Sequence, residues 1–123
     1  MAYRVNDEKV VWRVVDGEAV LLHADTSAYY GLNRVGTLMW ETLLAQPLDS
    51  RGLQTWARQQ FPDAPEGIDG DVAEFLGQLE AFALLESTDA EPGRPGTSPS
   101  STPYEPPQIT PFGELEKLIL SGE

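Results

Sequence analysis

The chain has 123 residues, with twenty acidic side chains against eight basic ones and no cysteine. The absence of cysteine excludes disulfides, thiolate nucleophiles and cysteine-based zinc sites. Nucleic-acid binders usually carry a basic surface, because neutralising phosphates supplies most of their non-specific affinity, so the acidic balance argues against such a partner. The first residues are charged, and no apolar run is long enough for a signal peptide or a membrane span, so we expect a cytoplasmic protein.

The N-terminal third has the pattern of three antiparallel strands. Val10–Val15 and Glu18–His23 are apolar runs on either side of an Asp-Gly dipeptide, which tolerates the positive φ angles of a hairpin turn. A third apolar run, Ala28–Leu32, follows a short polar stretch. We therefore predict a three-stranded meander whose third strand lies at an edge of the sheet.

The spacing of apolar residues then changes to that of helices. A first helix is predicted between Asn33, a good N-cap residue, and Pro47, which a helix rarely passes. A second helix is expected over residues 50–60, and a third is expected to begin within residues 68–72 and to end near Glu86. This order predicts an α+β fold of the winged-helix type, a three-stranded antiparallel sheet followed by three helices.

Composition divides the chain into three parts. Residues 1–87 carry the predicted elements and form the expected domain. Residues 88–103 are rich in Pro, Gly, Ser and Thr without apolar periodicity, which indicates a flexible linker. Residues 104–123 contain a second group of apolar residues, which a simple disordered tail would lack. Prolines keep the first half of this segment extended, and Glu114–Leu120 has the apolar spacing of a short helical turn.

The sequence has no recognisable catalytic, metal-binding or phosphate-binding motif. His23 is the only histidine, and one histidine without cysteine supplies neither a catalytic dyad nor a triad. Asp69 and Asp71 lack the spacing of an EF-hand, and acidic residues at the start of a helix stabilise its dipole. We therefore predict that the protein is not an enzyme and has no metal or other cofactor.

One stretch of the domain resembles a known family. Gly17–Leu44 is similar to a PqqD-type domain, the recognition element for ribosomally synthesised and modified peptides (RiPPs). The resemblance lies in the YYGLN run, the glycine three residues after that asparagine, and the tryptophan inside the first predicted helix. Together with the order of elements, it covers about residues 3–87. It implies binding of the leader part of a precursor peptide and its delivery to modifying enzymes, with a leader peptidase and a cyclase as the implied partners.

The resemblance also implies where the peptide binds. In this family the leader adds as a strand to the third strand, in the groove beside the third helix. The expected binding residues are therefore Ala28, Tyr29, Tyr30, Gly31, Leu32, Val72, Phe75, Leu76, Leu79 and Phe82. Because side chains alternate along a strand, Tyr30 and Leu32 are expected to face the helices and to line the groove.

The C-terminal segment resembles a lasso-peptide leader, which has a Tyr, a Pro three residues later, an aliphatic residue two further and a Gly four further. The expected anchors at this spacing are Tyr104, Pro107, Ile109 and Gly113. Ile119 stands where the family has the Thr that the leader peptidase needs, and no core peptide follows it. We therefore expect a leader that is fused to its own recognition domain and is competent for recognition but not for maturation.

Several alternatives remain open at the level of sequence. The fusion is natural or engineered, and the segment docks in cis or is swapped between two chains. A winged-helix DNA-binding regulator has the same elements, but the second and third predicted helices offer only Arg51 and Arg58 as cations. An enzyme fragment would need a partner for catalysis, and a scaffold whose tail binds another protein would not bind its own tail.

Overall fold

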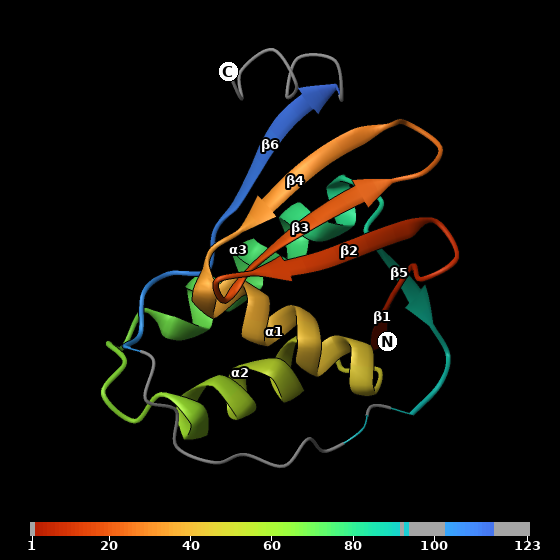
Figure 1. The fold of residues 1–123 in the computed structure, drawn as a ribbon. Helices are drawn as coiled ribbons and strands as arrows, with labels where there is room; N and C mark the ends of the chain where they lie inside the picture. The colour runs from red at the N-terminus through yellow and green to blue at the C-terminus, as the bar shows by residue number, and fades with distance from the viewer. Residues whose placement is uncertain (1, 92, 94–102, 115–123) are drawn as a thin grey trace.

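The computed structural model describes residues 2–91, 93 and 103–114. In chain order the elements are β1 (Ala2–Val5), β2 (Val10–Val15), β3 (Glu18–His23), β4 (Ala28–Leu32), α1 (Arg34–Ala45), α2 (Ser50–Gln60), α3 (Ile68–Ala81), β5 (Leu85–Thr88) and β6 (Ile109–Glu114). Helices α1 and α3 lie against one face of the larger sheet, and α2 packs beside α3 on the side away from that sheet (Figure 1). The protein is thus a mixed α and β structure, with antiparallel sheets and the three predicted helices.

The larger sheet has the strand order β2-β3-β4-β6, and every neighbouring pair is antiparallel. The predicted hairpin between β2 and β3 is confirmed, since Val15 pairs with Glu18 across a turn in which Asp16 and Gly17 both have positive φ. The prediction of a three-stranded sheet was wrong, because β6 adds a fourth strand beside β4. The sequence gives β6 no alternating apolar pattern, and only the family resemblance led us to expect a strand added beside β4.

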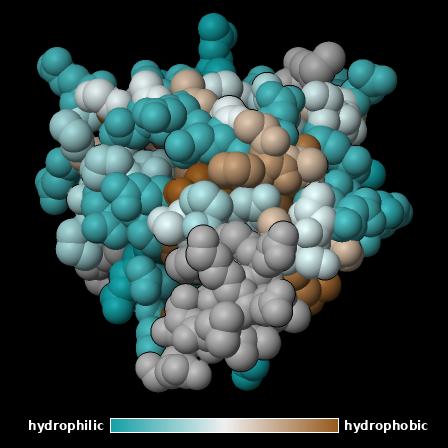
Figure 2. Space-filling view, turned by 90° about the horizontal axis from the view of Figure 1, so that it is seen from above, coloured by the Kyte–Doolittle hydropathy of each residue, from teal (hydrophilic) through white to brown (hydrophobic). Residues whose placement is uncertain are grey.

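The hydrophobic core lies between the larger sheet and the helices. Its largest fully buried side chains include Leu21 of β3, Trp40 of α1, Leu53 of α2 and Phe75 of α3. Hydrophilic side chains cover most of the face seen from above, and hydrophobic surface gathers near the centre of that face (Figure 2). Among the described residues, no helix has the length and hydrophobicity needed to cross a membrane.

A second sheet, which the sequence analysis missed, joins the two ends of the domain. Strand β1 pairs with β5 from Ala2 opposite Thr88 to Val5 opposite Leu85. Helix α3 was expected to end near Glu86 but ends at Ala81, because Ala83 takes a left-handed conformation with φ of 61°. The apolar residues that seemed to prolong the helix belong to the turn and to β5 instead.

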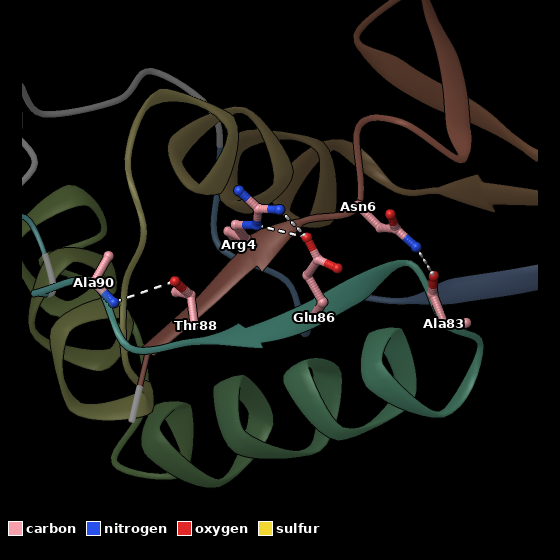
Figure 3. A network of polar contacts seen from close by, with 6 residues as sticks. All are labelled: Arg4, Asn6, Ala83, Glu86, Thr88 and Ala90. Carbon is pink, nitrogen blue, oxygen red and sulfur yellow. Dashed lines mark hydrogen bonds and ion pairs between the residues drawn. The ribbon is translucent and has the colours of Figure 1, made fainter.

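Polar contacts accompany the pairing of β1 with β5 (Figure 3). Arg4 forms an ion pair with Glu86 across the two strands, and the Asn6 side chain donates a hydrogen bond to the Ala83 carbonyl (3.3 Å). These groups are exposed, so each contact adds little net stability. Strand β5 continues to Thr88, one residue beyond the predicted domain boundary.

The first two helices begin and end close to the predicted residues. Asn33 caps α1 by accepting a hydrogen bond from the Gly36 N–H (2.9 Å), and Asp49 caps α2 through the Gly52 N–H (2.7 Å). Most of the predicted linker over residues 88–103, and the predicted helical turn after Glu114 with Ile119, lie outside the described residues.

Replacing Thr37 by Val should destabilise the fold. The Thr37 hydroxyl is buried and accepts a hydrogen bond from the Ala19 N–H at 2.8 Å, so it ties β3 to α1. Valine keeps the shape of threonine but leaves that buried N–H without an acceptor, which costs about 1–3 kcal/mol. Urea unfolding measures the change in the free energy of unfolding.

Thr42→Val is the matched control, because the Thr42 hydroxyl donates only to the Leu38 carbonyl within its own helix. We expect its effect to stay below about 0.5 kcal/mol, as for most substitutions that leave no buried group unpaired. Equal losses in the two variants would contradict the assigned role of Thr37.

Candidate functional site

A groove runs between β4 and α3, and residues 103–114 lie along it. The strand β6 pairs with β4 on one side of this segment and lies close to α3 on the other. A solvent-open pocket of about 390 Å³ remains between helix and segment, lined by Asp71, Glu74 and Gln78 of α3 and by residues 106–110. The groove therefore joins a sheet edge to one face of a helix.

Main-chain pairing joins the whole of β4 to β6. Leu32 lies opposite Ile109 at one end of the pairing, and Ala28 lies opposite Glu114 at the other. Between Tyr30, which is opposite Pro111, and Tyr29, which is opposite Gly113, the register shifts by one residue. Such a bulge suits a strand that contains proline, because a proline has no N–H to offer to a regular ladder. The five expected β4 residues thus all lie beside the C-terminal segment.

Side chains from β4 and α3 form the wall of the groove on its core side. Tyr30 and Leu32 are buried and face the helices, and the Tyr30 ring packs against Phe82 with 4.7 Å between ring centroids. The expected α3 residues Val72, Phe75, Leu76 and Leu79 are all buried in the hydrophobic core. Tyr104 and Ile109 of the C-terminal segment are partly buried and pack against that core.

Tyr104 makes the main side-chain contact of the segment with the helices. Its ring packs edge-on against Phe61, with 5.5 Å between centroids, and its hydroxyl donates a hydrogen bond to the Asp71 carboxylate at 2.8 Å. Burial raises the pKa of the Tyr104 phenol, and the hydrogen bond to Asp71 and the negative charge of that carboxylate raise it further. The phenol is therefore held as a neutral donor.

Asn33 makes a second contact, at the point where β4 ends and α1 begins. Its side-chain Nδ2 donates to the Pro106 carbonyl (2.8 Å), and its Oδ1 accepts from the Gln108 N–H (3.1 Å). The Asn33 main-chain N–H also donates to the Gln108 carbonyl (3.3 Å). Pro107, between these two residues, is buried. One residue therefore binds the main chain on both sides of Pro107.

The comparison with protein families decides the class of the domain. The family model described as "Coenzyme PQQ synthesis protein D (PqqD)" matches residues 18–85, which run from β3 to the start of β5 and carry most of the groove. The chain belongs to the PqqD family. No curated protein matches the chain significantly.

A solved structure is similar to this PqqD-family chain over most of its length. It is described as "TbiB1 in Complex with the TbiA(beta) Leader Peptide". The two share 27% sequence identity with a TM-score of 0.58, and the match covers 71% of this chain and 99% of TbiB1. The similarity therefore extends over the whole of that neighbour and supports the fold assigned to the PqqD domain here.

Three residues of the PqqD domain contact the segment but were not among the expected binding residues. They are Asn33, Phe61 and Asp71. Asn33 was recognised as a helix cap and as the last residue of the YYGLN run, and Asp71 only as an acidic residue in the first turn of a helix. No local signal distinguishes these second roles, because each depends on a partner more than thirty residues away in the chain. Among the described residues, no group of three or more His, Cys, Asp or Glu could hold a metal ion.

We expect raising the pH above about 10 to weaken the contact of Tyr104 with Asp71. The pKa of the phenol is raised in the folded protein above its ordinary value of 10.0. Its contribution to stability is thus fully present below pH 10 and is lost as the pH rises toward the higher folded-state pKa. Spectrophotometric titration of tyrosine ionisation should show a late component that the Tyr104→Phe variant lacks.

Tyr30 also titrates late, because burial raises its pKa, so the comparison must be made with the variant and not with free tyrosine. Asp71→Asn should move the ionisation of Tyr104 to lower pH, since it removes the carboxylate charge. A titration curve unchanged by both substitutions would contradict the contact.

Proposed function

We propose that the PqqD domain of this chain binds a precursor leader peptide without catalysis, and that residues 104–123 are such a leader joined in cis. The observation that carries the proposal is the packing of Tyr104 and Ile109 against the core while β6 pairs with β4. These two residues are the Tyr and the aliphatic residue of the lasso-leader spacing. TbiB1, which resembles this chain, is described in complex with a leader peptide, and this supports the same class of ligand.

The binding free energy in this proposal has two sources. Main-chain hydrogen bonds to an exposed sheet edge give affinity that depends little on sequence, and side chains that fill pockets give specificity. Tyr104 enters between α2 and α3, where it contacts Phe61 and Asp71. Ile109 packs at the start of β6. A few buried residues of this kind usually carry most of the energy of an interface.

The bound leader would be presented to enzymes that the chain itself does not contain. A leader peptidase and a cyclase are the proposed partners, as the family resemblance implies. Ile119 stands where lasso leaders have the Thr that the peptidase needs, so we propose recognition of this segment without its maturation.

Joining the leader to the domain favours the bound state. A short flexible linker gives an effective concentration on the order of mM. If the free affinity is near micromolar, the closed state is favoured by about 4 kcal/mol. Multi-angle light scattering should therefore find the full chain monomeric, whereas a dimer would indicate that the segment is swapped between two chains.

The proposal predicts that a peptide of residues 103–123 binds the isolated domain. A chain that ends at Glu91 keeps β5 and all of the groove residues except those of the segment itself. Calorimetric titration should give a dissociation constant in the micromolar range or tighter. Tyr104→Ala or Ile109→Ala in the peptide should each weaken binding by about 2 kcal/mol, roughly thirtyfold.

The control peptide carries Thr110→Ala, because the Thr110 side chain is exposed and alanine keeps its main-chain pairing with Gly31. Circular dichroism of the shortened domain establishes that it is folded before the titration. A folded domain that binds none of the peptides would refute the function, and equal affinity for all of them would refute the two anchors.

A further inference from the structure

The structure assigns Asn33 a role in peptide specificity that goes beyond capping α1. We propose that its carboxamide recognises the main chain of an extended segment around Pro107, so that a ligand must offer an N–H at position 108 and needs none at 107. We call this pair of hydrogen bonds, from Asn33 to the Pro106 carbonyl and to the Gln108 N–H, the asparagine clamp. The inference rests on the proposed function and names the class of peptide that the groove accepts.

The clamp matches the geometry of an extended chain. In such a chain the carbonyl of one residue and the N–H of the second residue after it point to the same side, as they do toward a neighbouring strand. A carboxamide carries a donating NH2 group beside an accepting oxygen, so Asn33 binds both groups, at 2.8 Å and 3.1 Å. It continues the pairing of β4 with the segment beyond Leu32, where the strand itself has ended.

The same geometry explains why proline is suitable at position 107. The N–H of the middle residue would point to the opposite side of the chain, so proline at that position loses no bond to Asn33. Proline also fixes φ, which reduces the conformational entropy that the free peptide loses when it binds. At position 108 a proline would instead remove the N–H that donates to Asn33 Oδ1. The groove thus favours proline at one position and excludes it at the next.

Gly36 provides the space that the clamp needs. A Cβ atom at this position would lie 3.0 Å from Asn33 Oδ1, 3.2 Å from Phe75 Cζ and 3.3 Å from the Gln108 carbonyl oxygen. The Gly36 N–H donates to the same Oδ1 that accepts from Gln108. The first turn of α1 and the peptide therefore meet at one oxygen, and a side chain at position 36 would push them apart.

The two roles of Asn33 can be separated by substitution. Aspartate caps a helix as well as asparagine does, so Asn33→Asp keeps the bond from Gly36. It replaces the Nδ2 donor, which faces the Pro106 carbonyl, by a negatively charged carboxylate oxygen. This oxygen can only accept hydrogen bonds, so it repels the carbonyl oxygen. The substitution should therefore weaken peptide docking while it leaves α1 intact. Asp49→Asn makes the reverse exchange at the cap of α2, away from the segment, and is the matched control.

Amide hydrogen exchange of the full chain tests the clamp. Asn33→Asp loses the hydrogen bond to the Pro106 carbonyl and leaves an acceptor facing that oxygen. Exchange over residues 109–114 should therefore be about tenfold faster in this variant. Gln108→Pro should act in the same way, whereas Gln108→Ala keeps its N–H and should exchange like the unaltered chain. Exchange over residues 34–45 should stay unchanged in Asn33→Asp and in Asp49→Asn.

The outcomes separate the clamp from the proposed function. If Asn33→Asp and Gln108→Pro exchange like the unaltered chain while Tyr104→Ala exchanges faster, the clamp is refuted and the docking of the segment stands. Faster exchange over residues 34–45 in Asn33→Asp would assign the residue a merely structural role and also refute the clamp. If residues 109–114 are unprotected in the unaltered chain, both proposals fail.

Discussion

The edge of β4 is the constraint on which the rest of the site depends. Every strand has main-chain donors and acceptors on two sides, and groups left without partners away from water are costly. On one side β3 pairs with β4, and on the other side β6 does. Because α3 lies along that second side, a chain that pairs with β4 also meets an apolar wall. Affinity for the main chain and selectivity for side chains therefore arise in one groove.

Neutral groups, and not opposite charges, bind the segment in this groove. The chain has a formal net charge of −12, and the segment in the groove carries acidic residues such as Glu105 and Glu114. Within the described part of the chain, the contacts made by the segment are ring packing, main-chain pairing and hydrogen bonds from neutral groups. The acidic domain and the acidic segment are therefore joined through neutral groups. These are the Tyr104 phenol, which donates to Asp71, and the Asn33 carboxamide, and neither contact needs a basic residue.

Local signals were sufficient for part of the fold. The turn at Asp16 and Gly17 and the start of α1 at Asn33 depend on the conformational preferences of single residues, and the structure agrees with both. The end of α3 was misplaced because Leu84 and Leu85 continue the apolar spacing of the helix although they belong to a turn and a strand. The short strands β1 and β5 were missed, since each takes its form from pairing with the opposite end of the domain.

The sequence by itself determined the class of the domain, the hairpin, the three helices and the spacing of the residues from Tyr104 to Gly113. The family resemblance led us to expect that the segment adds beside the third strand. Only the tertiary structure decided the register of β6 on β4, the contacts of Tyr104 with Asp71 and Phe61, and the binding of Asn33 to the main chain around Pro107. The physical reason is the distance along the chain. Helix caps and turns depend on residues a few positions apart, whereas Tyr104 and Asp71 are 33 residues apart and Asn33 and Pro106 are 73 apart. Such contacts exist only once the sheet and helices have brought the two segments together.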